Sequence, residues 1–163
     1  MRYADITTCD LANGKMLGVV LWCQGCSLNC PGCQNKCTHA AAEGREFTKA
    51  EEDMIISELK RPQISRLTLS GGHPLEPYNI DACLALCKRV REEAPDAQIW
   101  CYTGWLWEDV KDLEIMQYID VLVDGPYVES LRDITLPWRG SYNQRIIDVK
   151  ASLQTDAVYM IAD

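Results

Sequence analysis

The sequence predicts a single α/β domain over residues 1–163, built as an incomplete (β/α) barrel of about five parallel βα units. Three observations lead to this prediction. Strand-like apolar runs alternate with helical patterns, and every predicted strand ends in glycine or polar residues. The 163 residues are also too few for an eight-unit barrel of about 250 residues, and at roughly 30 residues a unit they provide about five. An open barrel needs a cover, and a protein partner is the natural candidate.

The first predicted strand covers Leu17–Trp22, which is an apolar run with a pair of valines. The next element is a helix that begins at Thr48 and ends at about Lys60. Thr48 and Glu51 have the spacing of a capping box, in which the two side chains bond to free amide groups at a helix start. The predicted apolar side of this helix carries Met54, Ile55 and Leu59.

The second βα unit begins with an alternating strand over Arg66–Ser70 that breaks at Gly71 and Gly72. A helix over about Ile80–Glu93 follows, because apolar residues recur there at intervals of three and four. Its expected buried residues are Cys83, Leu84, Cys87 and Val90. The two cysteines have a spacing that would allow metal binding from one helix face, but we interpret them as small buried hydrophobic residues.

Two more strands complete the pattern, over Gln98–Tyr102 and Val121–Val123, with a helix between them marked by apolar residues at Leu106, Val110, Leu113 and Met116. The strands end at Thr103-Gly104 and Asp124-Gly125. Parallel α/β folds bind their ligands at the carboxyl ends of the strands. We therefore expect these turns, the Gly71-Gly72 turn and the segment after the first strand to line one site.

Composition excludes several classes of protein. The formal net charge is -8, from 16 basic and 24 acidic side chains, which is the opposite of the balance that a nucleic-acid binder shows. No apolar run approaches the roughly 18 residues of a membrane span. The first ten residues are polar and of mixed charge, without the apolar core of a secretory signal. We therefore expect a cytoplasmic protein with no nucleic-acid or membrane partner, in which disulfides do not form.

Three cysteines within eight residues are the strongest chemical signal in the chain. Cys26, Cys30 and Cys33 provide three thiolates from one short loop. Three is one fewer than a cube of four irons or a closed tetrahedral zinc site needs. One metal position would therefore stay open for a substrate.

Other interpretations of the nine cysteines remain open at this stage. Cys23 and Cys37 flank the three, so two C-x2-C pairs, Cys23/Cys26 and Cys30/Cys33, resemble a zinc site, although such pairs are usually a dozen or more residues apart. A cysteine nucleophile paired with histidine is also formally available. The two histidines, His39 and His73, are too few for a multi-histidine metal centre.

The cysteine loop resembles that of radical S-adenosylmethionine (SAM) enzymes. In that family three cysteines hold a [4Fe-4S] cluster, and SAM binds the fourth iron through its amino and carboxylate groups. The resemblance implies that Cys26, Cys30 and Cys33 are the metal ligands here, with no further catalytic side chain beyond them. The difficult chemistry then belongs to the cofactor, and the protein binds and orients it.

A second motif, Ser70-Gly-Gly-His-Pro74, stands where radical SAM enzymes carry a turn that binds the amino group of SAM. Gly71 and Gly72 leave the backbone bare for such an approach. The family usually has an acidic residue where this chain has His73, and a neutral imidazole brings no negative charge. We predict that the substitution His73→Asp tightens SAM binding.

The remaining SAM contacts are expected from position in the fold. The aromatic residue that commonly neighbours the third cysteine is missing here. We still expect Gly32, Cys33 and Gln34 to lie beside SAM, because the loop that carries them has no other place to go. Thr103 and Asp124 are expected at the rim of the site, because they end predicted strands.

The whole pattern resembles the small activating proteins of anaerobic (class III) ribonucleoside-triphosphate reductases. This resemblance implies an enzyme that cleaves SAM and leaves a glycyl radical on the reductase catalytic subunit, with a low-potential electron donor such as flavodoxin. Two alternatives remain: a small radical SAM enzyme similar to carboxy-deazaguanine synthases, and a non-catalytic iron-sulfur or zinc module. The matching segments are Asp10–Gly14, Cys30–Lys36, Phe47–Lys49, Leu69–Gly72, Tyr102–Gly104, Val123–Gly125 and Trp138–Arg145.

Overall fold

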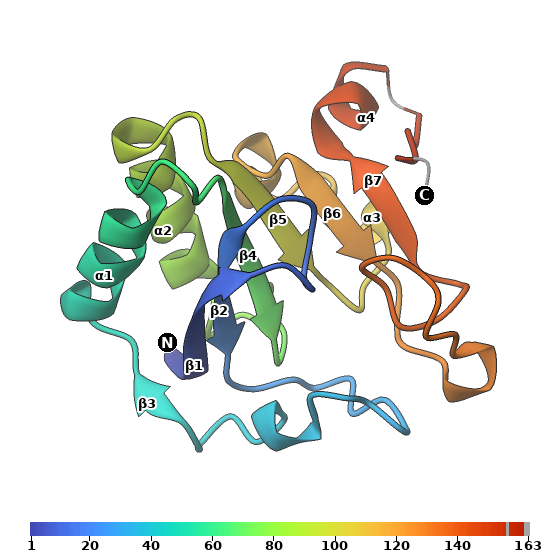
Figure 1. Cartoon of the computed structure of the whole chain (residues 1–163). Helices are drawn as coiled ribbons and strands as arrows, with labels where there is room; N and C mark the ends of the chain where they lie inside the picture. The colour runs from blue at the N-terminus through green and yellow to red at the C-terminus, as the bar shows by residue number, and fades with distance from the viewer. Residues whose placement is uncertain (156, 162–163) are drawn as a thin grey trace.

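A seven-stranded mixed sheet forms the centre of the molecule, in the order β3-β1-β2-β4-β5-β6-β7 (Figure 1). The computed structural model describes residues 1–155 and 157–161. The strands are β1 (Arg2–Asp10), β2 (Gly18–Cys23), β3 (Arg45–Glu46), β4 (Arg66–Gly71), β5 (Gln98–Tyr102), β6 (Val121–Asp124) and β7 (Arg145–Asp148). The α-helices are α1 (Lys49–Leu59), α2 (Ile80–Glu93), α3 (Trp107–Val110) and α4 (Val149–Thr155), with 3-10 turns η1 (Lys36–Thr38), η2 (Glu114–Gln117) and η3 (Glu129–Leu131).

Four neighbouring strands, β2, β4, β5 and β6, are parallel, which confirms the predicted α/β class. The expected number of about five parallel units was too high, because the strands added on either side, β1 and β7, run antiparallel to their neighbours. The sequence prediction did not include β1. The side chains of β1 are mostly exposed or half-buried, so its sequence contains no apolar run that would predict a strand. Its pairing with β2 and β3 defines it as a strand.

The two faces of the sheet carry different residues, because side chains alternate along a strand. On β5, Ile99 and Cys101 belong to the main core, whereas Trp100 and Tyr102 lie on the opposite face. Helices α1 and α2 lie together against the first face (Figure 1). The second face is therefore left to the segments that follow β1 and β6.

Helix α1 confirms the predicted capping box: the Thr48 amide donates to Glu51 at 2.7 Å, and Ala50 donates to the Thr48 hydroxyl. The predicted apolar side was wrong at Met54, which is 42% exposed. Ile56 is buried in its place, beside Ile55 and Leu59. The pattern was ambiguous because three apolar residues follow one another, and packing against the sheet selects the last two.

Helix α2 has the predicted bounds, and it buries Cys83, Leu86, Cys87 and Val90, while Leu84 is only partly buried. The predicted helix through Leu106 and Met116 was wrong. Short helix α3 ends at Val110, and η2 begins after Leu113, whose backbone is extended. This break lets the short turns place Ile115 and Met116 in the core while Leu106 stays exposed. Among the described residues, no helix has the length and apolar character needed to cross a bilayer.

Candidate functional site

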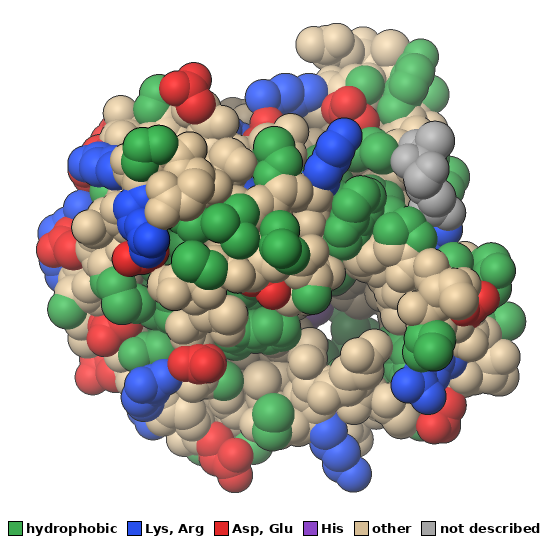
Figure 2. All heavy atoms as spheres, viewed as in Figure 1, with side chains coloured by type: hydrophobic (Ala, Val, Ile, Leu, Met, Phe, Trp, Pro, Cys, Tyr) green, Lys and Arg blue, Asp and Glu red, His purple; other side chains and the backbone are tan. Residues whose placement is uncertain are grey.

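A cavity of about 520 Å³ opens at the carboxyl ends of the four parallel strands. Figure 2 shows the surface hollowed beside the segment that follows β6. Each strand contributes its end or the turn after it, as the strand-end argument predicted. The lining residues from these turns are Cys26, Cys30, Cys33, Gln34, Ser70, Gly71, Gly72, His73, Tyr102, Thr103, Gly104 and Gly125.

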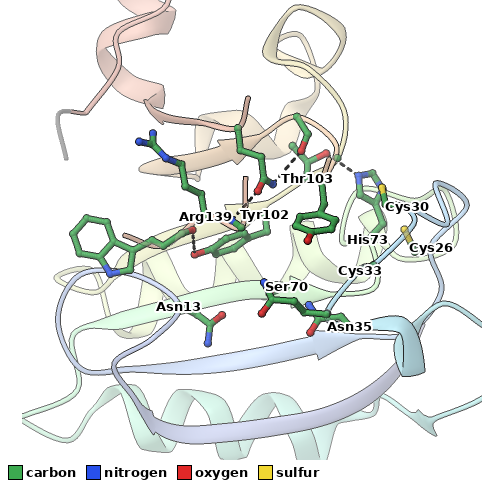
Figure 3. Close-up of a pocket in the computed structure, with 18 of the residues that line it drawn as sticks. Asn13, Cys26, Cys30, Cys33, Asn35, Ser70, His73, Tyr102, Thr103 and Arg139 are labelled. Carbon is green, nitrogen blue, oxygen red and sulfur yellow. Dashed lines mark hydrogen bonds between the residues drawn. The ribbon is translucent and has the colours of Figure 1, made fainter. Parts of the chain in front are cut away.

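The cysteine loop forms one wall of the cavity. Cys26, Cys30 and Cys33 are all half-buried and all line it. Hydrogen bonds hold the loop in place. The amide of Cys26 donates to the carbonyl oxygen of His39 at 3.0 Å, and the amide of Cys33 donates to the carbonyl oxygen of Cys30 at 3.2 Å. In Figure 3 the three cysteines are labelled close to His73, at one end of the cavity.

The two flanking cysteines lie elsewhere. Cys23 is buried at the end of β2, and Cys37 is exposed on η1, so neither faces the cavity. The structure thus separates the loop thiols into three that share a cavity and two that do not. This arrangement gives no support to a zinc site built from two C-x2-C pairs.

The donor set fits an iron-sulfur cluster by its chemistry, because thiolates are the ligands that such clusters use. Among residues 1–155 and 157–161, no three Cys, His, Asp or Glu side chains already converge closely enough to hold one metal ion. A four-iron cube is wider than one ion, so its ligands stand farther apart around a larger space. Three thiols on the wall of a cavity of about 520 Å³ fit that requirement.

Burial favours the protonated form of the Cys26 and Cys33 thiols when no metal is bound. It is the largest cause of the raised pKa of Cys26 and of Cys33, and the neighbouring Cys30 adds to both shifts. A bound metal reverses this preference, because it favours the thiolate form. Cluster binding in this loop should therefore release protons.

Gly71 and Gly72 are required by packing between the turn at the end of β4 (Gly71–Pro74) and the cysteine loop. Gly71 has a φ of +95°, and a Cβ atom there would lie 2.8 Å from the backbone of Cys23. A Cβ atom on Gly72 would lie 2.4 Å from the carbonyl oxygen of Gly25. The amide of Gly72 donates to the carbonyl oxygen of Cys23, and the amide of His73 donates to the carbonyl oxygen of Gly25, each at 2.8 Å. The two motifs therefore form one continuous wall.

His73 is 1% exposed and lines the cavity. Its Nε2 lies 2.7 Å from the hydroxyl of Thr103, and its ring packs edge-on against Trp105 at 4.3 Å between centroids. Burial lowers the pKa of His73 from 6.5 to about 4, despite the nearby carboxylate of Glu76. The imidazole is therefore neutral at physiological pH, and the effect of His73→Asp on SAM binding stays a prediction.

The other residues expected near SAM have different surroundings. Gln34 and Thr103 line the cavity, whereas Gly32 is exposed outside it. Asp124 is fully buried behind the wall. Its carboxylate accepts hydrogen bonds from Arg145 Nη2 at 2.5 Å and from the amide of Trp107 at 2.7 Å. These bonds hold the Asp124 side chain within the protein interior and provide no support for a direct contact with SAM.

The sequence prediction missed the walls on the second face of the sheet. Ala12 and Asn13, after β1, line the cavity, as do Trp138 and Arg139, after β6. Both pairs lie in motifs that carry the family resemblance, so the signal was present without an assigned role. The hydroxyl of Tyr102 donates to the carbonyl of Trp138 at 2.7 Å and joins the later segment to the sheet (Figure 3).

Comparisons with known proteins agree with this geometry. Residues 12–147 match the model of a family described as a 4Fe-4S single cluster domain, which is the class that the cysteine-lined cavity indicates. The chain is 41% identical over 148 residues to the anaerobic ribonucleoside-triphosphate reductase-activating protein of Escherichia coli strain K12, covering 88% of this chain and 96% of the relative.

The proteins of the same name from Vibrio cholerae and Enterobacteria phage T4 are also 41% identical, over 150 and 146 residues. These alignments cover 90% of this chain and 97% and 93% of the respective relatives. The chain belongs to the family of anaerobic ribonucleoside-triphosphate reductase-activating proteins. This confirms the family that the sequence motifs predicted.

Proposed function

We propose that this protein binds a [4Fe-4S] cluster and SAM in the cavity and generates a glycyl radical on the catalytic subunit of anaerobic ribonucleoside-triphosphate reductase. The observation that carries the proposal is the shared wall of the three loop cysteines and the Gly71-Gly72 turn, in a chain that is 41% identical to reductase-activating proteins. Family membership favours this function over a small-molecule enzyme or a non-catalytic module.

The cysteine loop would hold three irons of the cluster through Cys26, Cys30 and Cys33 and leave the fourth iron for SAM. When bound, the cluster supplies the single electron that breaks the sulfur to C5′ bond of SAM and yields methionine and a 5′-deoxyadenosyl radical. That radical would take a hydrogen atom from a glycine Cα of the reductase. We propose a low-potential donor such as flavodoxin as the source of the electron.

The residues around the cavity would bind SAM and shield it from water. The backbone of Gly71 and Gly72 lies beside the cysteine wall, where the amino group of SAM would bind. Gln34 and Thr103 line the same space and offer polar groups to SAM. We propose Gln34, Thr103 and the backbone of Gly71 and Gly72 as SAM contacts, with His73 as a neutral neighbour.

One aspect of the architecture supports an activase. The sheet is open, with β3 and β7 at its edges, which is compatible with an incomplete barrel that a protein partner covers.

One sheet includes strands from Arg2 to Asp148, so we propose that the chain acts as one domain. The nine cysteines are free thiols, which agrees with a reducing compartment, and we propose the cytoplasm.

The test is anaerobic. The protein is reconstituted with iron and sulfide, reduced, mixed with SAM and assayed for 5′-deoxyadenosine. The reductase is then added, and electron paramagnetic resonance should show the doublet of a glycyl radical. A triple variant with alanine at the three loop cysteines serves as the control and should give neither product.

Each outcome has a distinct meaning. 5′-Deoxyadenosine without a radical on the reductase would favour a small-molecule substrate instead of a protein. A protein that binds zinc, or an iron centre whose spectrum ignores added SAM, would overturn the proposal.

A further inference from the structure

Glu76 connects the turn at the end of β4 (Gly71–Pro74), which we propose binds SAM, to the cysteine loop. It lies three residues beyond His73, between the turn and α2, and is only 4% exposed. Its Oε1 atom accepts hydrogen bonds from both the amide of Ser27, at 2.8 Å, and the hydroxyl of Ser27, at 2.5 Å. Ser27 directly follows Cys26, so the Glu76 carboxylate holds the residue next to a predicted cluster ligand.

The same carboxylate oxygen lies 3.8 Å from Nδ1 of His73. That nitrogen is buried without a hydrogen-bond partner, while the other ring nitrogen contacts Thr103. Since His73 is neutral, Glu76 supplies negative charge behind this part of the wall.

We propose that Glu76 is a positioning residue for the cluster and SAM: it fixes the loop at Cys26 through Ser27 and supplies the negative charge that His73 cannot. This inference rests on the proposed function. Net charge and hydrogen bonds around an iron-sulfur cluster set its reduction potential, and groups that orient metal ligands affect affinity and activity by about 10- to 100-fold. Glu76 can exert both effects from behind the wall.

The loop has other anchors that do not involve the Glu76 carboxylate. The amide of His73 donates to Gly25 at 2.8 Å, and the side chain of Asn79 donates to the carbonyl of Gln24 at 3.0 Å. A substitution that removes only the charge of Glu76 therefore leaves much of the loop's support in place. The effect of the Glu76 charge can therefore be measured in a variant that keeps the fold.

The test compares Glu76→Gln with Ser27→Ala. Glutamine keeps the size and an acceptor oxygen but removes the charge, whereas Ser27→Ala keeps the charge and removes one of the two donors. The matched control is Glu92→Gln, which makes the same charge change at an exposed position on α2. Each variant is reconstituted anaerobically, and three properties are measured: iron per chain, midpoint potential by titration, and KM and kcat for 5′-deoxyadenosine formation.

Glu76→Gln should make the midpoint potential less negative and lower kcat/KM for SAM roughly tenfold, with iron content near that of the parent. Ser27→Ala should keep the parental potential but lose iron faster to a chelator, because the loop is held less firmly. Glu92→Gln should match the parent in every measurement.

Glu76→Gln with a parental potential and parental kinetics would overturn the proposal. If circular dichroism shows that Glu76→Gln does not fold, Ser27→Ala decides, and parental iron retention in that variant would overturn it. A parent that holds a cluster but forms no 5′-deoxyadenosine would refute the proposed function instead, while the comparison of midpoint potentials would still test Glu76.

Discussion

The guanidinium of Arg66 is fully buried, and its Nη2 atom donates to the carboxylate of Asp10 at 2.9 Å. The same atom also donates to the backbone carbonyl of Asp10, and Nη1 donates to that of Asn13. Although burial raises the pKa of Asp10, hydrogen bonds from Arg66 and Asn13 outweigh it and lower the pKa overall. Arg66 therefore ties the loop after β1, which carries Ala12 and Asn13 to the cavity, onto β4.

The substitution Arg66→Met should lower the free energy of unfolding by about 3 kcal/mol, because Asp10 would keep a largely buried charge without its partner. KM for SAM should rise as the loop loosens. Urea unfolding measures the first effect. Arg61→Met is the control, because Arg61 pairs with Glu58 at the surface and should cost less than about 1 kcal/mol. Equal losses in the two variants would contradict the assigned role of Arg66.

Alanine at Cys26, Cys30 or Cys33 should abolish binding of an intact [4Fe-4S] cluster, because each substitution removes one of the three proposed protein ligands. Alanine at Cys37, which is exposed outside the cavity, should leave the cluster in place. Iron and sulfide content and the electron paramagnetic resonance spectrum check both expectations. Loss of the cluster in Cys37→Ala would show that the ligand set differs from the one proposed.

His73 should make stability depend on pH. Its folded pKa, about 4, lies below the ordinary 6.5, so the unfolded chain binds the proton more readily. The contribution of the neutral His73 side chain to the free energy of unfolding is therefore fully present above about pH 6.5, and it declines as the pH falls toward 4. Between about pH 7.5 and about pH 5.5 the loss should be roughly 1.3 kcal/mol. Urea unfolding of the parent and of His73→Gln at both pH values isolates it, and equal pH dependence in the two would disprove it.

Asp124→Asn should lower stability without changing KM for SAM. The carboxylate is buried against Arg145, so losing its charge should cost about 2 kcal/mol. Thermal or urea unfolding and SAM kinetics are measured on the same sample. Unchanged stability together with a large rise in KM would instead support the direct SAM contact that the sequence suggested.

Ile134 should affect the partner protein and leave SAM cleavage unchanged. It is 85% exposed and lines the cavity in the segment after β6, so an approaching reductase would meet it. Ile134→Glu should lower the glycyl radical yield roughly tenfold, while 5′-deoxyadenosine formation without the reductase stays at the parental rate. Met54→Glu on α1 is the control, because Met54 is exposed and lies outside the cavity lining. Equal radical yields in both variants would place the docking surface elsewhere.

The sequence by itself determined the features that depend on local chemistry. Spacing within one loop singled out Cys26, Cys30 and Cys33, which the structure places in the lining of one cavity, and regular apolar intervals gave α2 its bounds. The capping box at Thr48 could be predicted equally well, because the side chains of Thr48 and Glu51 accept hydrogen bonds from backbone amides within a single helical turn. Such patterns need no information about the rest of the chain.

Only the tertiary structure decided features that depend on residues far apart in sequence. β1 has no apolar run and is defined by its pairing partners, and the helix expected over Leu106–Met116 is broken so that short turns can reach the core. Asp124 ends a strand as predicted, but Arg145 from β7 turns its carboxylate away from the cavity lining. Glu76 gains its contact with Ser27 in the same way, across 49 positions. The physical reason is that burial and charge pairing depend on distances in space, which spacing along the chain does not specify.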